Sequence, residues 1–141
     1  MNDPSDREAK RPEQRLDEIL DRDRRYRREA YVFVSAALGH TVQTVGEGRH
    51  VTGRELCDGL RDYALRQFGR LARTVLESWG VCRTEDIGEI VFNMVEAGLL
   101  RKTEEDTRDD FAGLYDFEEA FDRSFEMHIG SGDVDEPGVE T

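Results

Sequence analysis

Apolar residues recur at steps of three and four along most of this chain, which is the periodicity of amphipathic helices. The first such pattern starts at Pro12 and extends to Leu38, and Gly39 then suits the left-handed position that ends many helices. The pattern predicts one long helix here, with a break near Arg28 as the alternative. The residues that follow, 40–50, are predicted to form a loop.

Two further helices are predicted in succession after this loop. Thr52 and Glu55 form the Thr-x-x-Glu capping box that opens a helix. Gly69 interrupts the periodic pattern, and a second apolar run then continues to Gly80. The sequence therefore predicts one helix from Thr52 to about Gly69 and another that ends near Gly80.

A last strongly periodic helix is expected between Thr84 and Gly98. Thr84 is a favourable N-cap residue, and Glu85 follows it in the first turn, where the helix dipole favours anions. Gly59 and Gly88 fall inside predicted helices, where glycine is about 0.5–1 kcal/mol less favourable than alanine. Since a bend or a close approach usually offsets that difference, we expect a neighbouring helix to pack tightly against Gly88.

The periodicity changes beyond this helix. Residues 111–117 are typical of a short strand, which would pair with residues 99–102 in a hairpin. The sequence therefore predicts a mainly α fold, a helical domain of four to five helices, with a short winged-helix-like β-hairpin near residues 99–117 as an addition.

The chain is long enough for one domain with tails, and it contains no internal repeat. We expect a single helical domain over residues 13–129. A disordered N-terminal tail, 1–12, and a disordered acidic C-terminal tail, 130–141, are predicted to flank it, because both segments are polar and poor in apolar residues.

Charge is distributed unevenly along the chain. The net charge is −12, and residues 84–141 carry 18 acidic and 4 basic side chains, whereas residues 1–30 balance and residues 31–83 carry a net charge of +2. A field of this sign repels phosphate backbones and anionic membrane surfaces, and it steers basic partners. The acidic C-terminal half is therefore a candidate surface for binding another protein.

An aromatic stripe lies within this acidic half. Leu114, Phe117, Phe121 and Phe125 are spaced three, four and four residues apart, so a helix that begins near Asp116 would stack the last three on one face. The simplest interpretation is that the stripe belongs to the core. The alternative is that the segment docks into a groove of a partner protein, through the residues Tyr115, Phe117, Glu118, Phe121 and Phe125.

Two surfaces could bind nucleic acid, and the predicted helix between Thr84 and Gly98 is the less suitable one. In a winged-helix arrangement the recognition helix would be the one between Thr84 and Gly98, which carries four carboxylates and no basic residue. Such a helix argues against double-stranded DNA, since base and phosphate contacts need Arg, Lys, Asn or Gln. Arg66, Arg70 and Arg73 would share one helical face, for which the simplest interpretation is a solvated face with internal ion pairs, and the alternative is a surface for RNA or another anionic partner.

Residues that bind metals or perform catalysis do not form a recognised motif in this sequence. His40, His50, His128 and the two cysteines lack metal-ligand spacing, and no phosphate-binding loop is visible, so no cofactor or metal is expected. An enzyme would need a site assembled from distant residues, for which the candidates are His50, Glu55, Cys57 and Asn93.

Seven short segments carry a resemblance to a known family. They are RHVTGREL at 49–56, RDYALRQFG at 61–69, WGV at 79–81, TEDIGEIVFN at 84–93, KTEED at 102–106, DFAG at 110–113 and YDF at 115–117. Together they resemble the Minf family of small acidic bacterial proteins of unknown function, over about residues 26–125. The resemblance implies a bacterial cytosolic protein, and it supplies no catalytic or binding residues.

The sequence alone favours a cytoplasmic location and a binding role. The start of the chain lacks the hydrophobic stretch of a secretory signal, no apolar run approaches the length of a membrane span, and the two cysteines are then expected to stay reduced. We therefore expect a non-enzymatic interaction or regulatory module that uses the acidic C-terminal half. An enzyme, or an RNA-associated protein with an Arg-rich face, remains the alternative.

Overall fold

The computed structural model describes residues 11–46, 50–101 and 107–123 of the chain, and these residues are mainly helical. The described elements are five α-helices and three short helical segments. They are α2 (Pro12–Arg22), α3 (Arg28–Val45), α4 (Gly53–Phe68), η1 (Gly69–Leu71), α5 (Ala72–Ser78), α6 (Thr84–Glu96), η2 (Arg108–Phe111) and the π-helical η3 (Glu118–Arg123). The predicted mainly α fold is confirmed.

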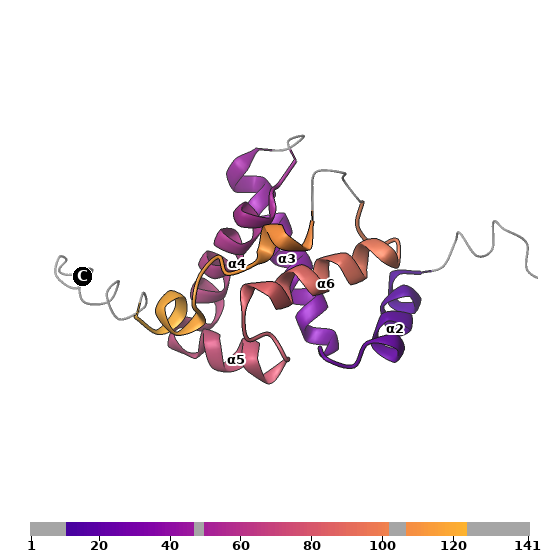
Figure 1. Cartoon of the computed structure of the whole chain (residues 1–141), viewed down its shortest axis with the longest axis horizontal. Coiled ribbons are helices and arrows are strands. Elements are labelled where there is room, and N and C mark those ends of the chain that lie inside the picture. The colour runs from indigo at the N-terminus through magenta and orange to yellow at the C-terminus, as the bar shows by residue number, and fades with distance from the viewer. Residues whose placement is uncertain (1–10, 47–49, 102–106, 124–141) are drawn as a thin grey trace, which may run out of the picture.

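Helix α3 lies at the centre of the arrangement. It packs against α4, α6 and α2. Figure 1 shows α6 crossing in front of α3, with α4 and α5 on one side and α2 on the other. Its core face buries Tyr31, Val34 and Ala37, each at most 2% exposed.

The first predicted helix is divided in the structure, as the alternative interpretation allowed. The chain is extended between α2 and α3, where Tyr26 is buried and the backbone N–H of Arg27 donates to the carbonyl of Trp79 at 3.1 Å. This long-range bond satisfies a backbone group outside the helix and so fixes the break. The two helices therefore diverge instead of forming one rod.

The predicted end of this helix at Gly39 is wrong. α3 continues to Val45 and ends at Gly46, whose φ of 108° is the left-handed conformation that favours glycine. The physical reason is Thr41, which is 2% exposed, donates its hydroxyl to the carbonyl of Ala37 at 2.8 Å and lies against Gly59 of α4. Burial of Thr41 holds the helical backbone past Gly39.

The helix boundaries further along the chain follow the predicted signals more closely. Thr52 and Glu55 form a reciprocal capping box at the start of α4. Gly69 and Gly80 have positive φ values and end α4 and α5. Thr84, in contrast, is the first residue of α6 and does not cap it.

The hydroxyl of Thr84 serves a different segment of the chain. Arg83 is the N-cap of α6, and the Thr84 hydroxyl accepts the backbone N–H of Leu114 at 3.2 Å. Thr84 is fully buried by this contact. Sequence reasoning missed this role because the partner lies 30 residues away.

The predicted β-hairpin is not supported, because the described residues between 99 and 117 form no strand. Thr107 and Asp110 form a capping box that starts η2, and Phe111 turns into the core at 2% exposure. A Cβ atom at Gly88 would lie 2.8 Å from Phe111, so the predicted close approach at Gly88 is confirmed, and the neighbour is this ring. Burial of Phe111 therefore outweighs strand pairing.

The last described residues return to the core. Phe117 and Phe121 are 4% and 1% exposed, and their rings contact each other with centroids 4.9 Å apart. The hydroxyl of Tyr115 donates to the carbonyl of Cys57 at 2.7 Å, which joins this segment to α4. Phe125 and the predicted tail 130–141 lie outside the described residues, as does most of the predicted tail 1–12.

Candidate functional site

From Val32 onward, the outer face of α3 is exposed and carries no charge. Val32, Ala36, Gly39 and Gln43 follow one another at helical spacing on the side opposite the core, and all four are exposed. Residues 30–46 contain no Asp, Glu, Lys or Arg over 17 positions, although 37% of the chain is charged. We call these four residues the uncharged face.

An aromatic cluster borders the uncharged face. The ring of Phe33 has its centroid 5.1 Å from that of Tyr63, 5.4 Å from that of Phe68 and 5.6 Å from that of Trp79. Phe33 is 8% exposed, and the other three rings are half-buried. Aromatic surface of this kind supplies large contact area at low conformational-entropy cost.

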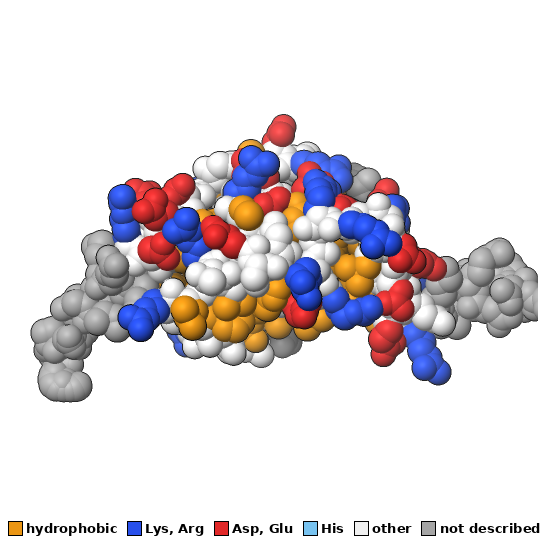
Figure 2. Space-filling view, turned by 90° about the horizontal axis from the view of Figure 1, so that it is seen from below, with side chains coloured by type: hydrophobic (Ala, Val, Ile, Leu, Met, Phe, Trp, Pro, Cys, Tyr) orange, Lys and Arg blue, Asp and Glu red, His pale blue; other side chains and the backbone are white. Residues whose placement is uncertain are grey.

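Two exposed aliphatic side chains neighbour members of this cluster in the sequence. Val32 is 59% exposed beside Phe33, and Leu71, three residues after Phe68, is 58% exposed. Figure 2 shows apolar side chains gathered along the lower edge of the view, with blue Arg side chains on either side. Because single exposed apolar residues are ordinary but contiguous patches indicate contact surfaces, this region is the strongest candidate site on the described chain.

The Arg residues predicted to bind an anionic partner lie near this surface, but two of them are already paired. Nε of Arg66 donates to Asp62 at 3.0 Å, and Nη1 of Arg73 donates to Asp122 at 2.6 Å. Arg70 is exposed in η1. The structure therefore brings the three residues to neighbouring turns, and carboxylates within the chain neutralise Arg66 and Arg73.

A polar network on the other side of α3 joins the α2–α3 connection to α6. The side-chain amide of Asn93 donates to Asp23 at 2.9 Å and to the hydroxyl of Tyr31 at 3.1 Å. Arg25 binds the same carboxylate through Nε at 3.0 Å and Nη2 at 2.7 Å. These bonds, the strongest of which comes from Arg25, hold the pKa of Asp23 well below its usual range.

A second carboxylate of α6 extends the network. Glu89 accepts from Arg25 at 3.3 Å and from Arg108 at 3.2 Å, and the Arg108 guanidinium lies 5.2 Å from the centre of the Phe92 ring. Since Arg108 belongs to η2, this contact fastens the segment after residue 107 to α6. The two carboxylates of the network are matched by two guanidinium groups, so the network is neutral overall. Its role is to hold these segments of the fold together.

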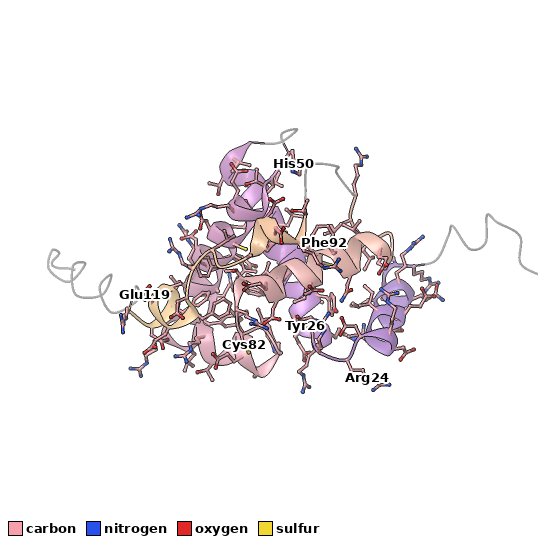
Figure 3. The ribbon with its side chains drawn as sticks, in the orientation of Figure 1. Arg24, Tyr26, His50, Cys82, Phe92 and Glu119 are labelled. Atoms are coloured by element: carbon pink, nitrogen blue, oxygen red, sulfur yellow. The ribbon has the colours of Figure 1, made fainter. Side chains whose placement is uncertain are left out.

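Tyr26 also fastens the α2–α3 connection to α6, at Asp86, one turn before Glu89. Its hydroxyl donates to Asp86 at 2.5 Å, and the backbone N–H of Cys82 donates to the other oxygen of that carboxylate at 2.9 Å. Burial, followed by the Asp86 carboxylate, raises the pKa of Tyr26. Tyr26 and Cys82 lie on the lower side of α6, whereas His50 lies at the opposite side of the molecule (Figure 3).

Three of the four residues of the enzyme alternative have structural roles in the described chain, and the fourth, His50, is half-buried just before α4. Glu55 caps α4, and the Asn93 amide binds Asp23 and Tyr31. Cys57 is fully buried, and that burial raises the pKa of its thiol to about 12. A thiol with this pKa stays protonated at neutral pH and is a poor nucleophile.

The predicted docking residues of the acidic half are divided between core and surface. Glu118 is exposed and Tyr115 is half-buried, but Phe117 and Phe121 are core residues and could anchor a partner only if this segment moved. The simpler interpretation of the stripe, that it belongs to the core, is confirmed for these two rings.

Sequence reasoning missed the uncharged face and the Asp23–Arg25–Asn93 network. The first had a usable signal, namely 17 consecutive uncharged residues in a highly charged chain. The second had none, because Asp23 and Asn93 are 70 residues apart.

The described fold and site define this chain as a small helical protein with an uncharged helix face and an adjoining aromatic cluster. No family model matches the chain, and neither a curated protein nor a solved structure was found to be similar. The resemblance to the Minf family therefore stays a prediction. Among the described residues, none of the helices has the length and apolar composition that crossing a bilayer requires, and no group of three His, Cys, Asp or Glu side chains is placed to hold a metal ion.

Proposed function

We propose that this protein acts by binding another protein chain, as an interaction or regulatory module. The observation that supports this proposal most strongly is the exposed apolar surface made by Val32, Leu71 and the adjoining aromatic cluster. Removing such a surface from water lowers the free energy by about 25 cal/mol per Å² of apolar area. That stabilisation is absent while the surface stays exposed to solvent. The surface therefore suits contact with a partner.

The acidic C-terminal half contributes to this proposal through its charge and not through its aromatic residues. Phe117 and Phe121, which were expected to insert into a partner, are buried, but Asp116, Glu118 and Glu119 are exposed. Exposed carboxylates act mainly on the rate and selectivity of encounter, so we assign them to steering of a basic partner. An anionic partner is less well supported, since Arg66 and Arg73 are already neutralised.

The experiment is purification of the tagged chain from its native host after mild crosslinking, with mass spectrometry of the captured proteins. A stoichiometric partner should be captured by the unchanged chain and lost when Val32 and Leu71 are both changed to Arg. Ala112→Arg is the matched control, because Ala112 is exposed in the segment after η2. The control should keep the partner.

The acidic surface is tested in the same experiment by Glu118→Lys together with Glu119→Lys. A partner lost only in this variant would move the docking surface to the acidic half, as the sequence predicted. A captured protein that none of these variants affects would contradict both versions of the proposal.

A further inference from the structure

The aromatic cluster forms one contiguous surface that joins α3, α4 and the end of α5. Phe33 contacts the rings of Tyr63, Phe68 and Trp79, and the rings of Phe68 and Trp79 also contact each other, with centroids 6.0 Å apart. At the other end, the ring of His40 lies 5.3 Å from that of Tyr63. Except for Phe33, all of these rings are half-buried. Partly exposed aromatic residues in contact with one another are typical of the core of a binding surface.

Two Arg residues close to this cluster in the chain are neutralised by carboxylates. Arg66 pairs with Asp62 at 3.0 Å. Arg73 is contacted by two carboxylates, Glu77 at 3.0 Å and Asp122 at 2.6 Å, so its surroundings are net negative. Since Asp122 belongs to η3, this pair also holds η3 against α5.

The negative charge of the chain is concentrated from η3 onward. Residues 116–141 contain nine carboxylates and a single Lys or Arg, which is Arg123, so they carry −8 of the net charge of −12. η3 packs against α5 and α4, and it presents the exposed carboxylates of Glu118 and Glu119. This charge is therefore attached to the two helices beside the aromatic cluster, where it favours a cationic ligand.

Two cations beside the cluster oppose this field without reversing it. The backbone of Arg27 binds the carbonyl of Trp79, and its guanidinium lies 3.7 Å from Glu29. Arg70 is exposed in η1. We therefore expect the cations of a ligand on the η3 side of the cluster and not beside Arg27 or Arg70.

An amphipathic helix combines the two properties that this region selects, because it carries an apolar stripe and a charged flank on one element. Aromatic ring faces also attract guanidinium and ammonium groups directly. We propose that the aromatic cluster is the docking surface for a basic amphipathic helix of a partner protein. Its apolar stripe covers Tyr63, Phe68 and Trp79, and its Lys and Arg side chains face the carboxylates of η3. This inference rests on the proposed function and names the chemistry of the partner.

Trp79 makes the contact measurable in the full chain, because it is the only tryptophan. The probe is a synthetic peptide of Leu and Lys with helical periodicity, about 18 residues long so that it can form a helix. It should shift the fluorescence of Trp79 to shorter wavelength in a saturable manner, since it removes water from the indole ring. Absence of a saturable shift would overturn the proposal.

Two further peptides separate charge from amphipathicity. One has the same composition in scrambled order, and the other has Glu in place of Lys. Both should bind with a dissociation constant at least about tenfold higher. Equal or tighter binding of the Glu peptide would show that Arg27 and Arg70 select the ligand, and equal binding of the scrambled peptide would show that a helix is not recognised.

The position of the cations is tested by reversing charges on η3. Glu118→Lys together with Glu119→Lys should raise the dissociation constant of the Leu/Lys peptide by at least about fivefold. Glu13→Lys with Asp21→Lys is the matched control, because it changes the net charge equally on α2, at the other side of the molecule (Figure 1). At about 0.1 M salt the control should change binding less than about twofold. Equal weakening by both pairs would reduce the interaction to general attraction and overturn the assigned surface.

The apolar contact is tested by changes that leave the charge unaltered. Tyr63→Ser should raise the dissociation constant at least about tenfold, and its thermal unfolding shows whether the fold is kept. Leu71→Ser, at a side chain that is 58% exposed, should raise it at least about threefold without disturbing the core. Ala112→Ser is the control and should have no effect. Unchanged binding in both Tyr63→Ser and Leu71→Ser would place the peptide elsewhere and overturn the proposal.

These results are distinguishable from failure of the proposed function. If the Leu/Lys peptide does not bind but capture of a protein from the native host still depends on Val32 and Leu71, the basic helix is the wrong occupant and the binding role stands. If the peptide does not bind and no capture depends on these residues, both proposals are wrong.

Discussion

At the scale of single residues, the network around Asp23 links three segments of the chain. Its carboxylate accepts from Arg25 and from Asn93, and Asn93 also contacts the buried Tyr31. Buried polar groups of this kind lose more when one partner is removed than they contribute when paired. The network is therefore where single substitutions should act most clearly on stability.

The lowered pKa of Asp23 predicts a pH-dependent contribution to stability. Because the folded-state pKa lies below the unfolded value of about 3.9, the contribution is present above about pH 4 and is lost as the pH falls further through the folded-state value. Asp23→Asn should lower the unfolding free energy at neutral pH by roughly 1–2 kcal/mol. Denaturant titrations of the two proteins should converge toward about pH 2, and a constant difference would contradict this explanation.

The two cysteines should differ sharply in reactivity. Cys57 is fully buried with a pKa of about 12, whereas Cys82 is exposed. In the native protein at about pH 8, a maleimide should modify one thiol per chain, and Cys57 should react at least about 100-fold more slowly. Cys82→Ser should leave no fast thiol until denaturant is added, and fast labelling of that variant would show that Cys57 is accessible.

At the scale of elements, glycine positions report which helices are closely packed. Gly88 of α6 lies next to Phe111, and a Cβ atom at Gly53, at the start of α4, would lie 3.1 Å from the same ring. This ring holds η2 between two helices, and it explains why the segment after residue 107 turns into the core. Gly39 of α3 has no such neighbour within the described chain.

Gly88→Ala and Gly39→Ala should therefore change stability in opposite directions. At Gly88 the added methyl would overlap the Cβ and ring of Phe111, and the resulting strain of roughly 1–3 kcal/mol exceeds the gain in helix propensity. Thermal unfolding of dilute protein should show a lower melting temperature for Gly88→Ala and a higher one for Gly39→Ala. A higher melting temperature for both variants would mean that Phe111 does not pack on α6 as described.

At the scale of the whole molecule, net charge and the uncharged face act in opposition. The net charge of −12 disfavours self-association at every separation that salt does not screen, whereas the uncharged face gains from contact.

Local patterns predicted much of the fold, because helix signals act over a few residues. The capping box of Thr52 and Glu55 and the glycine stops at Gly69 and Gly80 are confirmed in the structure. The hairpin and the end at Gly39 were wrong, because burial of Phe111 and Thr41 overrode the local signals. In each case the deciding contact joins residues that are distant in sequence.

The sequence by itself determined that this protein is mainly helical and acidic, since periodicity and charge are properties of the chain alone. Only the tertiary structure decided that Phe117 and Phe121 are core residues and that one face of α3 remains uncovered. The physical reason is that a helical pattern shows which side of a helix is apolar, but the packing of other helices decides which apolar surface is left in contact with water.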